Sequence, residues 1–307
     1  MRTQHYLMPV LAVAVLLMGL SCSRTPAQSK FATPDNAAKA LLRALKAENT
    51  EQITAIFGRN TLEAVASGDT VSDKSDREVV RLAMEQSWRW SPLGSDRKEL
   101  IIGDEQWPFP VPLAKSADQW VFDAEAGKQE VIARRVGRNE LGVIELCQWY
   151  VEVQKEYAAE SHDGKQAALY AQHLRSTRGH QDGLYWETNP DEKPSPLGDL
   201  VAEAAEEGYA KNQTESSPFW GYRFRILTGE GGAAPGGKKN YVVSGGMPGG
   251  FALVAYPAKY GSSGVMTFIV NRDRVVYEKD LGKDTLSLAA NMTEYNPDNS
   301  WASAQMP

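Results

Sequence analysis

The sequence predicts an α+β fold in which a module of short helices and an antiparallel sheet precedes a long helix packed on a second antiparallel sheet. Residues 31–87 repeat apolar side chains at helical spacing, and residues 124–160 form the longest such region. Between residues 222 and 279, short strand-like runs are separated by glycine-rich turns, which is typical of an antiparallel meander. We expect an N-terminal module at 31–124, a second module at 125–297 and a tail at 298–307.

Residues 1–21 have the features of a secretory signal peptide. Their apolar run, residues 6–20, is shorter than the roughly 20 residues that span a bilayer. The run ends in GLSCS, which resembles the bacterial lipobox, and that resemblance implies that Cys22 is acylated and becomes the new N-terminus. Residues 22–30 then form a short polar tether. The alternatives are a plain cleaved signal peptide and an uncleaved anchor.

This N-terminus predicts export, to the periplasm or to the outer membrane or cell surface, with a lipid anchor as the link to the membrane. The chain has two cysteines, so a lipidated Cys22 leaves Cys147 without an intrachain partner, and the core alone holds the fold. Cys147 lies in an apolar helical pattern and is expected to be a buried, inert thiol. The net charge of −6 and the absence of long basic clusters argue against a nucleic-acid partner.

The first module begins with a helix at residues 37–47, preceded by Thr33 as the expected N-cap and Pro34 in the first turn. Further helices are expected at 50–57, 61–67 and 76–85, and strands at 99–103, 107–113 and 119–123. Three prolines in WPFPVPL (107–113) confine that run to a sheet edge or an extended rim, because proline has no amide hydrogen to donate. The opening TPDNAAKALLRALKAEN and the closing KSADQWVFD resemble the nuclear-transport-factor-2-like cone, which implies a compact α+β fold with a pocket.

The second module begins with the helical region 124–160, in which Gly137 is expected to interrupt the helix. The part from 139 to 160, ~33 Å long, buries one stripe. That stripe contains Val143, Cys147, Tyr150 and Tyr157. A loop-rich stretch with a helix at 197–209 follows, and then the meander. Its strands are expected at 222–228, 240–244, 251–256, 265–270 and 274–279, with a final helix at 285–292.

Several long strings are similar to one bacterial family of exported proteins. They are WPFPVPL (107–113), RRVGRNEL (134–141), DGLYW (182–186), GYRFRIL (221–227) and GGFALVAYPAKYGSSGVMTFIVNRDRVVYEKDLG (249–282). On these strings the chain resembles the family called domain of unknown function 2950 over residues 31–297, a resemblance that implies no reaction. Residues 138–282 also resemble, more distantly, the headgroups of type IV pilins and pseudopilins, in which one long helix packs on an antiparallel sheet.

Two groups of residues are candidates for a binding site. Arg134, Arg135, Arg138 and Glu140 gather many charges in a short stretch, which indicates either a buried arginine–carboxylate network or a site for an anionic ligand. Trp107 and Trp186 are the tryptophans expected to be exposed and able to stack on sugars, whereas Trp120 and Trp149 lie in apolar patterns typical of a core.

No motif predicts catalysis, a metal or a cofactor. The histidines of the mature chain lack metal-binding spacing and are expected to be solvated loop residues, and the glycine runs lie between strands, as turns do. Residues 95–98 match S-x-x-K without its companion motifs. We therefore expect a cell-envelope lipoprotein with a structural or protein-interaction role, with an envelope protein as its partner. The alternatives are a protein that binds an envelope glycan or small ligand, and a hydrolase using Glu140, His180 or Glu187.

Overall fold

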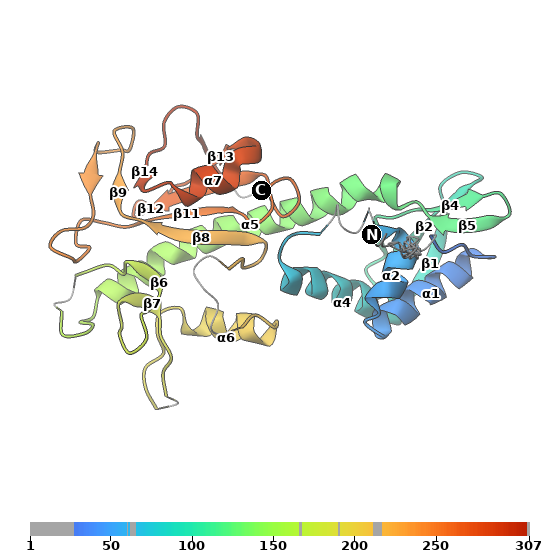
Figure 1. Ribbon diagram of the computed structural model, residues 1–307, viewed down its shortest axis with the longest axis horizontal. Coiled ribbons are helices and arrows are strands. Elements are labelled where there is room, and N and C mark those ends of the chain that lie inside the picture. The colour runs from blue at the N-terminus through green and yellow to red at the C-terminus, as the bar shows by residue number, and fades with distance from the viewer. Residues whose placement is uncertain are drawn as a thin grey trace, which may run out of the picture.

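The chain forms two lobes joined by one long helix (Figure 1). The computed structural model describes residues 28–59, 61, 66–165, 168–189, 191–210 and 217–305. The predicted signal peptide and Cys22 lie outside these residues, as does most of the predicted helix at 61–67. Helices and antiparallel sheets in both lobes confirm the α+β class. No helix in the described part of the chain is both long and apolar enough to cross a bilayer.

The first lobe, here the N-lobe, is built on a small antiparallel sheet. Its strand order is β1-β2-β4-β5, with β3 paired to β2. The strands are β1 (Trp88–Pro92), β2 (Arg97–Ile102), β3 (Trp107–Pro108), β4 (Leu113–Ser116) and β5 (Gln119–Phe122). β1 was not predicted, because WRWSP follows the preceding helix without a turn signal. Only the two ends of WPFPVPL lie in strands, and its proline-rich centre is the extended rim that its composition predicts.

In the described part of the lobe, three helices cover this sheet: α1 (Pro34–Lys46), α2 (Thr50–Phe57) and α4 (Thr70–Gln86). α1 begins as predicted, with Thr33 as the N-cap that accepts a hydrogen bond from the amide of Asn36. α4 begins six residues before the expected position, because the Asp69 carboxylate accepts from the first amides of the helix. The core between helices and sheet contains Leu41, Ile56, Met84, Leu100, Ile102, Leu113 and Phe122.

The long helix α5 (Ala124–Ala158) runs without a break for 35 residues, ~52 Å, and connects the two lobes (Figure 1). The predicted interruption at Gly137 is wrong. A glycine within a helix costs only about 1 kcal/mol relative to alanine, which packing along the rest of the helix readily offsets. The first half of α5 packs against the N-lobe so closely that a Cβ on Gly127 would lie 2.7 Å from the Cα of Val111. α5 therefore contributes to both lobes.

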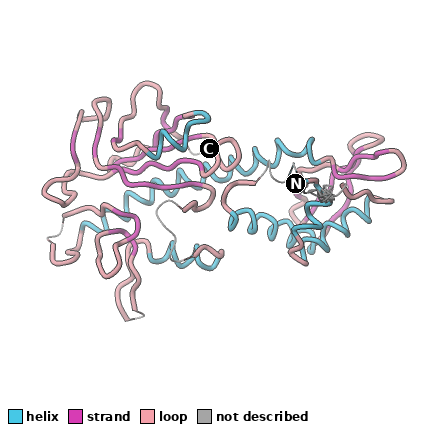
Figure 2. Tube along the Cα trace, in the orientation of Figure 1, coloured by secondary structure: helices cyan, strands magenta, loops and turns pink. Residues whose placement is uncertain are grey.

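The second lobe, here the C-lobe, contains the predicted antiparallel meander in the order β15-β13-β12-β11-β8 (Figure 2). Its strands are β8 (Tyr222–Leu227), β11 (Ala252–Pro257), β12 (Met266–Asn271), β13 (Val276–Asp280) and β15 (Ala302–Ser303). The strand expected at 240–244 is reduced to β10 (Lys239–Asn240), which pairs with β9 (Gly229–Glu230), and β9 pairs in parallel with β14 (Glu294–Tyr295). β15 lies in the segment expected to be a tail and pairs with β13.

The second half of α5 packs on this sheet through the predicted stripe of Val143, Cys147, Tyr150 and Tyr157, all of them buried. The prediction that Cys147 is buried is confirmed, and burial raises the pKa of its thiol to about 12, which favours the protonated form at neutral pH. The remaining elements are β6 (His173–Arg175), β7 (Gly183–Tyr185), α6 (Gly198–Glu206), a 3₁₀ helix (Gly282–Asp284) and α7 (Thr285–Ala290). The helices expected at 197–209 and 285–292 are thus confirmed, and β6 and β7 lie in the stretch expected to be loops.

Candidate functional site

The N-lobe contains an open cavity of about 640 Å³ between its three helices, the first half of α5 and the proline-rich rim. This volume lies within the range of pockets that hold small organic ligands. Most of the wall is apolar. Its apolar side chains include Leu41, Leu45, Ile53, Phe57, Val79, Val80, Phe109, Val111 and Val131.

Helical spacing explains which residues reach the cavity. On α4, Asp73, Asp76, Arg77 and Val80 follow one another at steps of three, one and three residues, so they share one face of the helix. On α5, the lining residues recur at three- and four-residue steps in the same way. They are Ala124, Lys128, Val131, Arg134, Arg135 and Arg138.

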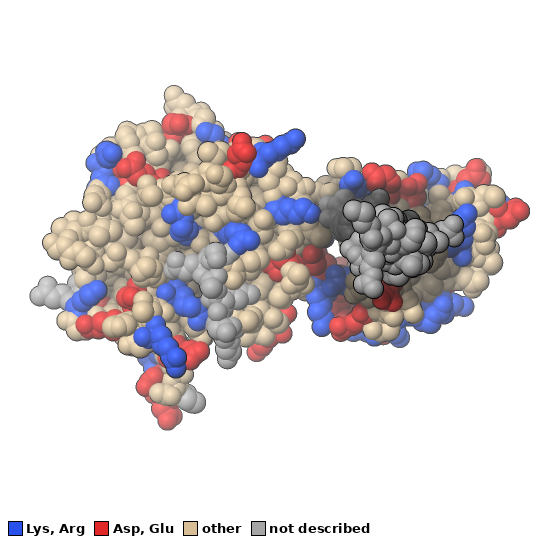
Figure 3. All heavy atoms as spheres, in the orientation of Figure 1, with Lys and Arg blue, Asp and Glu red and all other residues tan. Residues whose placement is uncertain are grey.

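The charged part of the wall is predominantly basic. Of the residues that the structure describes, five basic ones line the cavity, against the acidic pair Asp73 and Asp76: Arg77, Lys128, Arg134, Arg135 and Arg138. The whole chain carries a net charge of −6, and on the face shown in Figure 3 acidic and basic side chains are interspersed over both lobes. The cavity therefore has a local charge opposite in sign to that of the protein.

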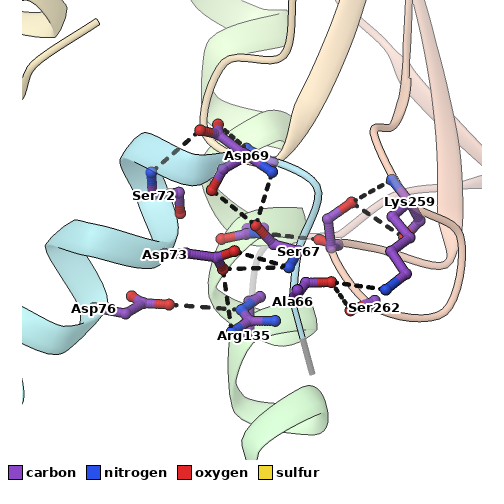
Figure 4. Close-up of polar contacts among 12 residues, drawn as sticks. Ala66, Ser67, Asp69, Ser72, Asp73, Asp76, Arg135, Lys259 and Ser262 are labelled. Carbon is purple, nitrogen blue, oxygen red and sulfur yellow. Dashed lines mark hydrogen bonds and ion pairs between the residues drawn. The ribbon is translucent and has the colours of Figure 1, made fainter. Parts of the chain in front are cut away.

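Arg135 and Arg138 form an ion-pair network with the two aspartates of α4. Figure 4 shows Arg135 beside Asp73 and Asp76. Arg135 is 8% exposed; its Nη2 lies 3.4 Å from Asp73 Oδ1 and its Nε 3.5 Å from Asp76 Oδ2. Arg138 is 57% exposed, and its Nη1 lies 2.6 Å from the other oxygen of Asp76. An arginine–carboxylate network was one of the two predicted arrangements, but its carboxylates belong to α4 and Glu140 has no part in it.

Arg134 and Trp107 form a second pair at the rim. The guanidinium lies 5.1 Å from the centre of the indole ring, donates to the carbonyl of Pro108 over 2.7 Å, and pairs with Glu130 over 2.7 Å. Trp107 is 37% exposed, as expected from the sequence, but one face of its ring is occupied by an arginine. The pair forms part of the cavity wall.

Glu140 contacts the C-lobe instead. Its Oε1 accepts hydrogen bonds from the amides of Val265 and Met266, over 2.8 and 2.9 Å, at the start of β12. The Tyr222 hydroxyl donates to the Met266 carbonyl over 3.0 Å and lies 3.5 Å from the same Glu140 oxygen. Burial first, and then the charge of Glu140, raise the pKa of Tyr222 well above its ordinary value, so this hydroxyl keeps its proton. These contacts fix one end of a strand to α5.

Trp186 lies far from Trp107, at the C-terminal end of α5. It packs edge-on against Tyr157 and His162 beside a small polar pocket of about 200 Å³. His162 is buried, stacks on Tyr157 with ring centres 4.0 Å apart, and lies 2.8 Å through Nε2 from the Tyr157 carbonyl. The prediction that this histidine is a solvated loop residue is wrong, because the Tyr157 ring covers it.

Two of the residues considered for a hydrolase, Glu140 and His180, lie far apart. His180 is exposed and lies 3.4 Å from Asp163, a residue just beyond the C-terminal end of α5. Glu140 lies near the middle of that helix, about 27 Å along its axis from the end at residue 158. Among the described residues, no group of three or more histidine, cysteine, aspartate or glutamate side chains is arranged to hold a metal ion.

Trp149, expected in the core, is 38% exposed, which corrects that prediction. It lines an apolar groove of about 150 Å³ between α5, α6 and the C-lobe sheet, together with Leu146, Leu200 and Phe224. The apolar pattern around Trp149 reflects this groove.

A second polar cluster joins the lobes. Asp69 is 2% exposed: its Oδ1 accepts from the amides of Val71 and Ser72, and its Oδ2 from the Tyr209 hydroxyl over 2.7 Å and the Gly221 amide over 3.1 Å. Next to it, the carbonyl of Ala66 accepts from Lys259 over 3.0 Å and from Ser262 over 2.9 Å (Figure 4). We call these residues the lobe junction.

Sequence reasoning missed the lobe junction. A glycine–aspartate pair directly before a helical run, here Gly68 and Asp69, is a signal for a helix N-cap and could have located the start of α4. The contacts of Asp69 with Tyr209 and Gly221 had no signal, because they join segments about 140 to 150 residues apart.

A family model described as "Protein of unknown function (DUF2950)" matches residues 28–304. No curated protein and no solved structure matches the chain. The resemblances of the two modules to nuclear-transport-factor-2-like cones and to pilin headgroups stay predictions.

Proposed function

Since the chain belongs to the DUF2950 family, whose description states no function, we propose a function from the geometry of the N-lobe: the protein binds an apolar ligand in its cavity. In this proposal it is a binding protein of the cell envelope, held at the membrane by a lipid on Cys22. The resemblance to that family, expected from the sequence strings, is confirmed by a match over nearly the whole chain.

The observation that carries the proposal is the cavity itself. Apolar surface in contact with water costs about 25 cal/mol for each Å². A ligand that covers the side chains of Leu41, Ile53, Phe57 and Val131 would recover part of that free energy. Convergent polar groups at a pocket favour binding, whereas the dispersed positions of Glu140 and His180 give no support to hydrolysis. A structural or protein-interaction role is the alternative, and it does not need an open cavity.

A neutral fluorescent probe such as N-phenyl-1-naphthylamine is expected to bind the full chain and to brighten on transfer from water to the apolar wall. Replacing Val80, which is half-buried and lines the cavity, by phenylalanine should weaken binding about tenfold because the larger ring takes up part of the space. The measurement is a fluorescence titration.

The matched control is Leu82→Phe, on the same helix but outside the cavity and 47% exposed. It should leave the affinity for the probe unchanged. If the probe does not bind the parent chain, or binds it and Val80→Phe equally well, the proposed function is wrong.

For the anchor, we expect metabolic labelling with a fatty-acid analogue to mark the native protein and to fail completely on Cys22→Ser, since a serine hydroxyl cannot form the thioether to the lipid. Cys147→Ala is the control, because it removes the other cysteine of the chain and should keep the label. The mass of the mature N-terminus checks the site. A native protein that keeps Met1 and carries no acyl group would contradict the anchor.

A further inference from the structure

We propose that the ligand of the N-lobe cavity is a single-chain amphiphile with one anionic head group, a carboxylate or a phosphate. This inference rests on the proposed function and specifies its ligand class. In this arrangement the basic residues of α4 and α5 bind the head group, and the apolar side chains of α1 and α2 contact the hydrocarbon chain of the ligand.

The two sides of the cavity differ in chemistry. Among the described residues, every charged side chain that lines the cavity comes from α4 or α5. α1 and α2 contribute the apolar Leu41, Leu45, Ile53 and Phe57, and a single polar side chain, Thr50. A ligand that is polar throughout would leave the α1 and α2 side in poor contact, and a ligand that is apolar throughout would desolvate the arginines without compensation. A ligand with one polar end satisfies both sides.

The sign of the head group follows from the charges that are left over. Asp73 and Asp76, both half-buried, are each paired with the buried Arg135. Arg77 has no hydrogen bond or ion pair with any other residue that the structure describes. Lys128 has one weak pair, at 3.4 Å, with the exposed Glu125. These cations are therefore available to an anion.

Arg138 adds directional donors. More than half exposed, it bonds to Asp76 through Nη1, and the contact of its Nη2 with Asn139 Oδ1 is long, at 3.4 Å. A guanidinium has five N–H donors in a planar fork that matches a carboxylate or a phosphate, and such charge-assisted bonds are about twice as strong as neutral ones. Arg77 and Arg138 are accordingly the residues that we assign to the head group.

The test compares four compounds that share a twelve-carbon hydrocarbon chain and differ in the head group. Each compound is added, below its micellar concentration, to the full-length protein loaded with the neutral probe, and displacement of the probe is measured. Dodecanoate and dodecyl phosphate represent the anionic class from a free acid and from a phosphate-headed lipid, methyl dodecanoate is neutral, and dodecyltrimethylammonium is cationic. We expect both anions, or one of them, to displace the probe at concentrations about tenfold below those of the neutral and cationic compounds. The anion that displaces the probe at the lower concentration identifies the source of the ligand, either a free fatty acid or a phosphate-headed lipid.

The variant Arg77→Gln with Arg138→Gln should lose this preference, with the affinity for the anion falling about tenfold more than that for the neutral probe. Arg77→Gln alone removes a side chain without protein partners among the described residues, so it should fold normally and show part of the effect. Arg97→Gln is the control, since Arg97 lies in the same lobe, pairs with Asp123 on the surface and does not line the cavity.

Each outcome discriminates between the two proposals. If the neutral or cationic compound displaces the probe as well as the anions do, the ligand class is wrong and the proposed function stands. If the double variant keeps the anion preference, the assignment of Arg77 and Arg138 is wrong. If no compound and no probe binds the parent chain, both the ligand class and the proposed function are overturned.

Discussion

Replacing Asp69 by alanine is expected to lower the free energy of unfolding by roughly 3 kcal/mol and to loosen the lobe junction. Loss of a helix N-cap costs about 1 kcal/mol. The Tyr209 hydroxyl and the Gly221 amide would also lose their acceptor at a buried site, at a cost of about 1–3 kcal/mol for each group left unsatisfied. Urea denaturation followed by tryptophan fluorescence measures the first effect, and hydrogen exchange of the amides around residues 70–72 and 219–221 measures the second.

Asp69→Asn separates the two roles of this side chain. Its amide oxygen can still cap α4, but its NH₂ group would face the Gly221 N–H, which cannot accept a hydrogen bond. We expect a smaller loss of stability and the same increase in exchange at the junction. Asp96→Ala, in an exposed turn of the N-lobe, is the control and should change stability by less than about 0.5 kcal/mol. Equal stabilities of Asp69→Ala and Asp96→Ala would show that the junction contributes little.

Replacing Glu140 by alanine is expected to destabilise the C-lobe by about 2–3 kcal/mol. One carboxylate oxygen accepts from the amides of Val265 and Met266, and without it these two donors have no acceptor where β12 begins beside α5. Glu140→Gln keeps an oxygen at this position and should recover most of the loss. Thermal unfolding measures all three forms.

Glu145→Ala is the matched control for this series, because Glu145 is exposed on the same helix five residues further on. If Glu140→Ala were as stable as Glu145→Ala, the structural role assigned to Glu140 would be wrong.

The Glu140→Gln variant should also change how the stability of the protein depends on pH. Burial and then the charge of Glu140 raise the pKa of Glu278 above 4.5, so stability falls as pH rises from the ordinary glutamate range through that raised pKa. Removing the neighbouring charge should weaken this dependence.

Local pattern predicted much of the fold. The cap at Thr33, the buried stripe on α5 and four strands of the meander follow from rules that act over a few residues. The continuity of α5 through Gly137 did not follow, because it depends on the surfaces that the helix meets in both lobes. The N-cap at Asp69 was within reach of the sequence, but its partners in the C-lobe were not.

Some residues of the candidate site could likewise be predicted from the sequence, and others could not. Arg134, Arg135 and Arg138 lie three or four residues apart or side by side, and the prediction that they gather in one place is consistent with their shared position on the cavity wall. Grouping Glu140 with them was an avoidable error, because residues two apart on a helix, such as Arg138 and Glu140, point in nearly opposite directions. Asp73 and Asp76 could not be identified as partners, since that depends on how α4 and α5 cross.

If Cys22 carries the proposed lipid, the unbroken α5 would also affect how the two lobes are held at a membrane surface. The chain enters the N-lobe through Gln28, whose amide donates to the carbonyls of Ile56 and Phe122, so a lipid six residues earlier would keep that lobe close to the bilayer. Because each half of α5 packs into one lobe and Asp69 bonds to Tyr209 and Gly221, the C-lobe would keep one position relative to the N-lobe. The lipid would then position both lobes together, and the cavity would lie within reach of molecules that leave the lipid layer.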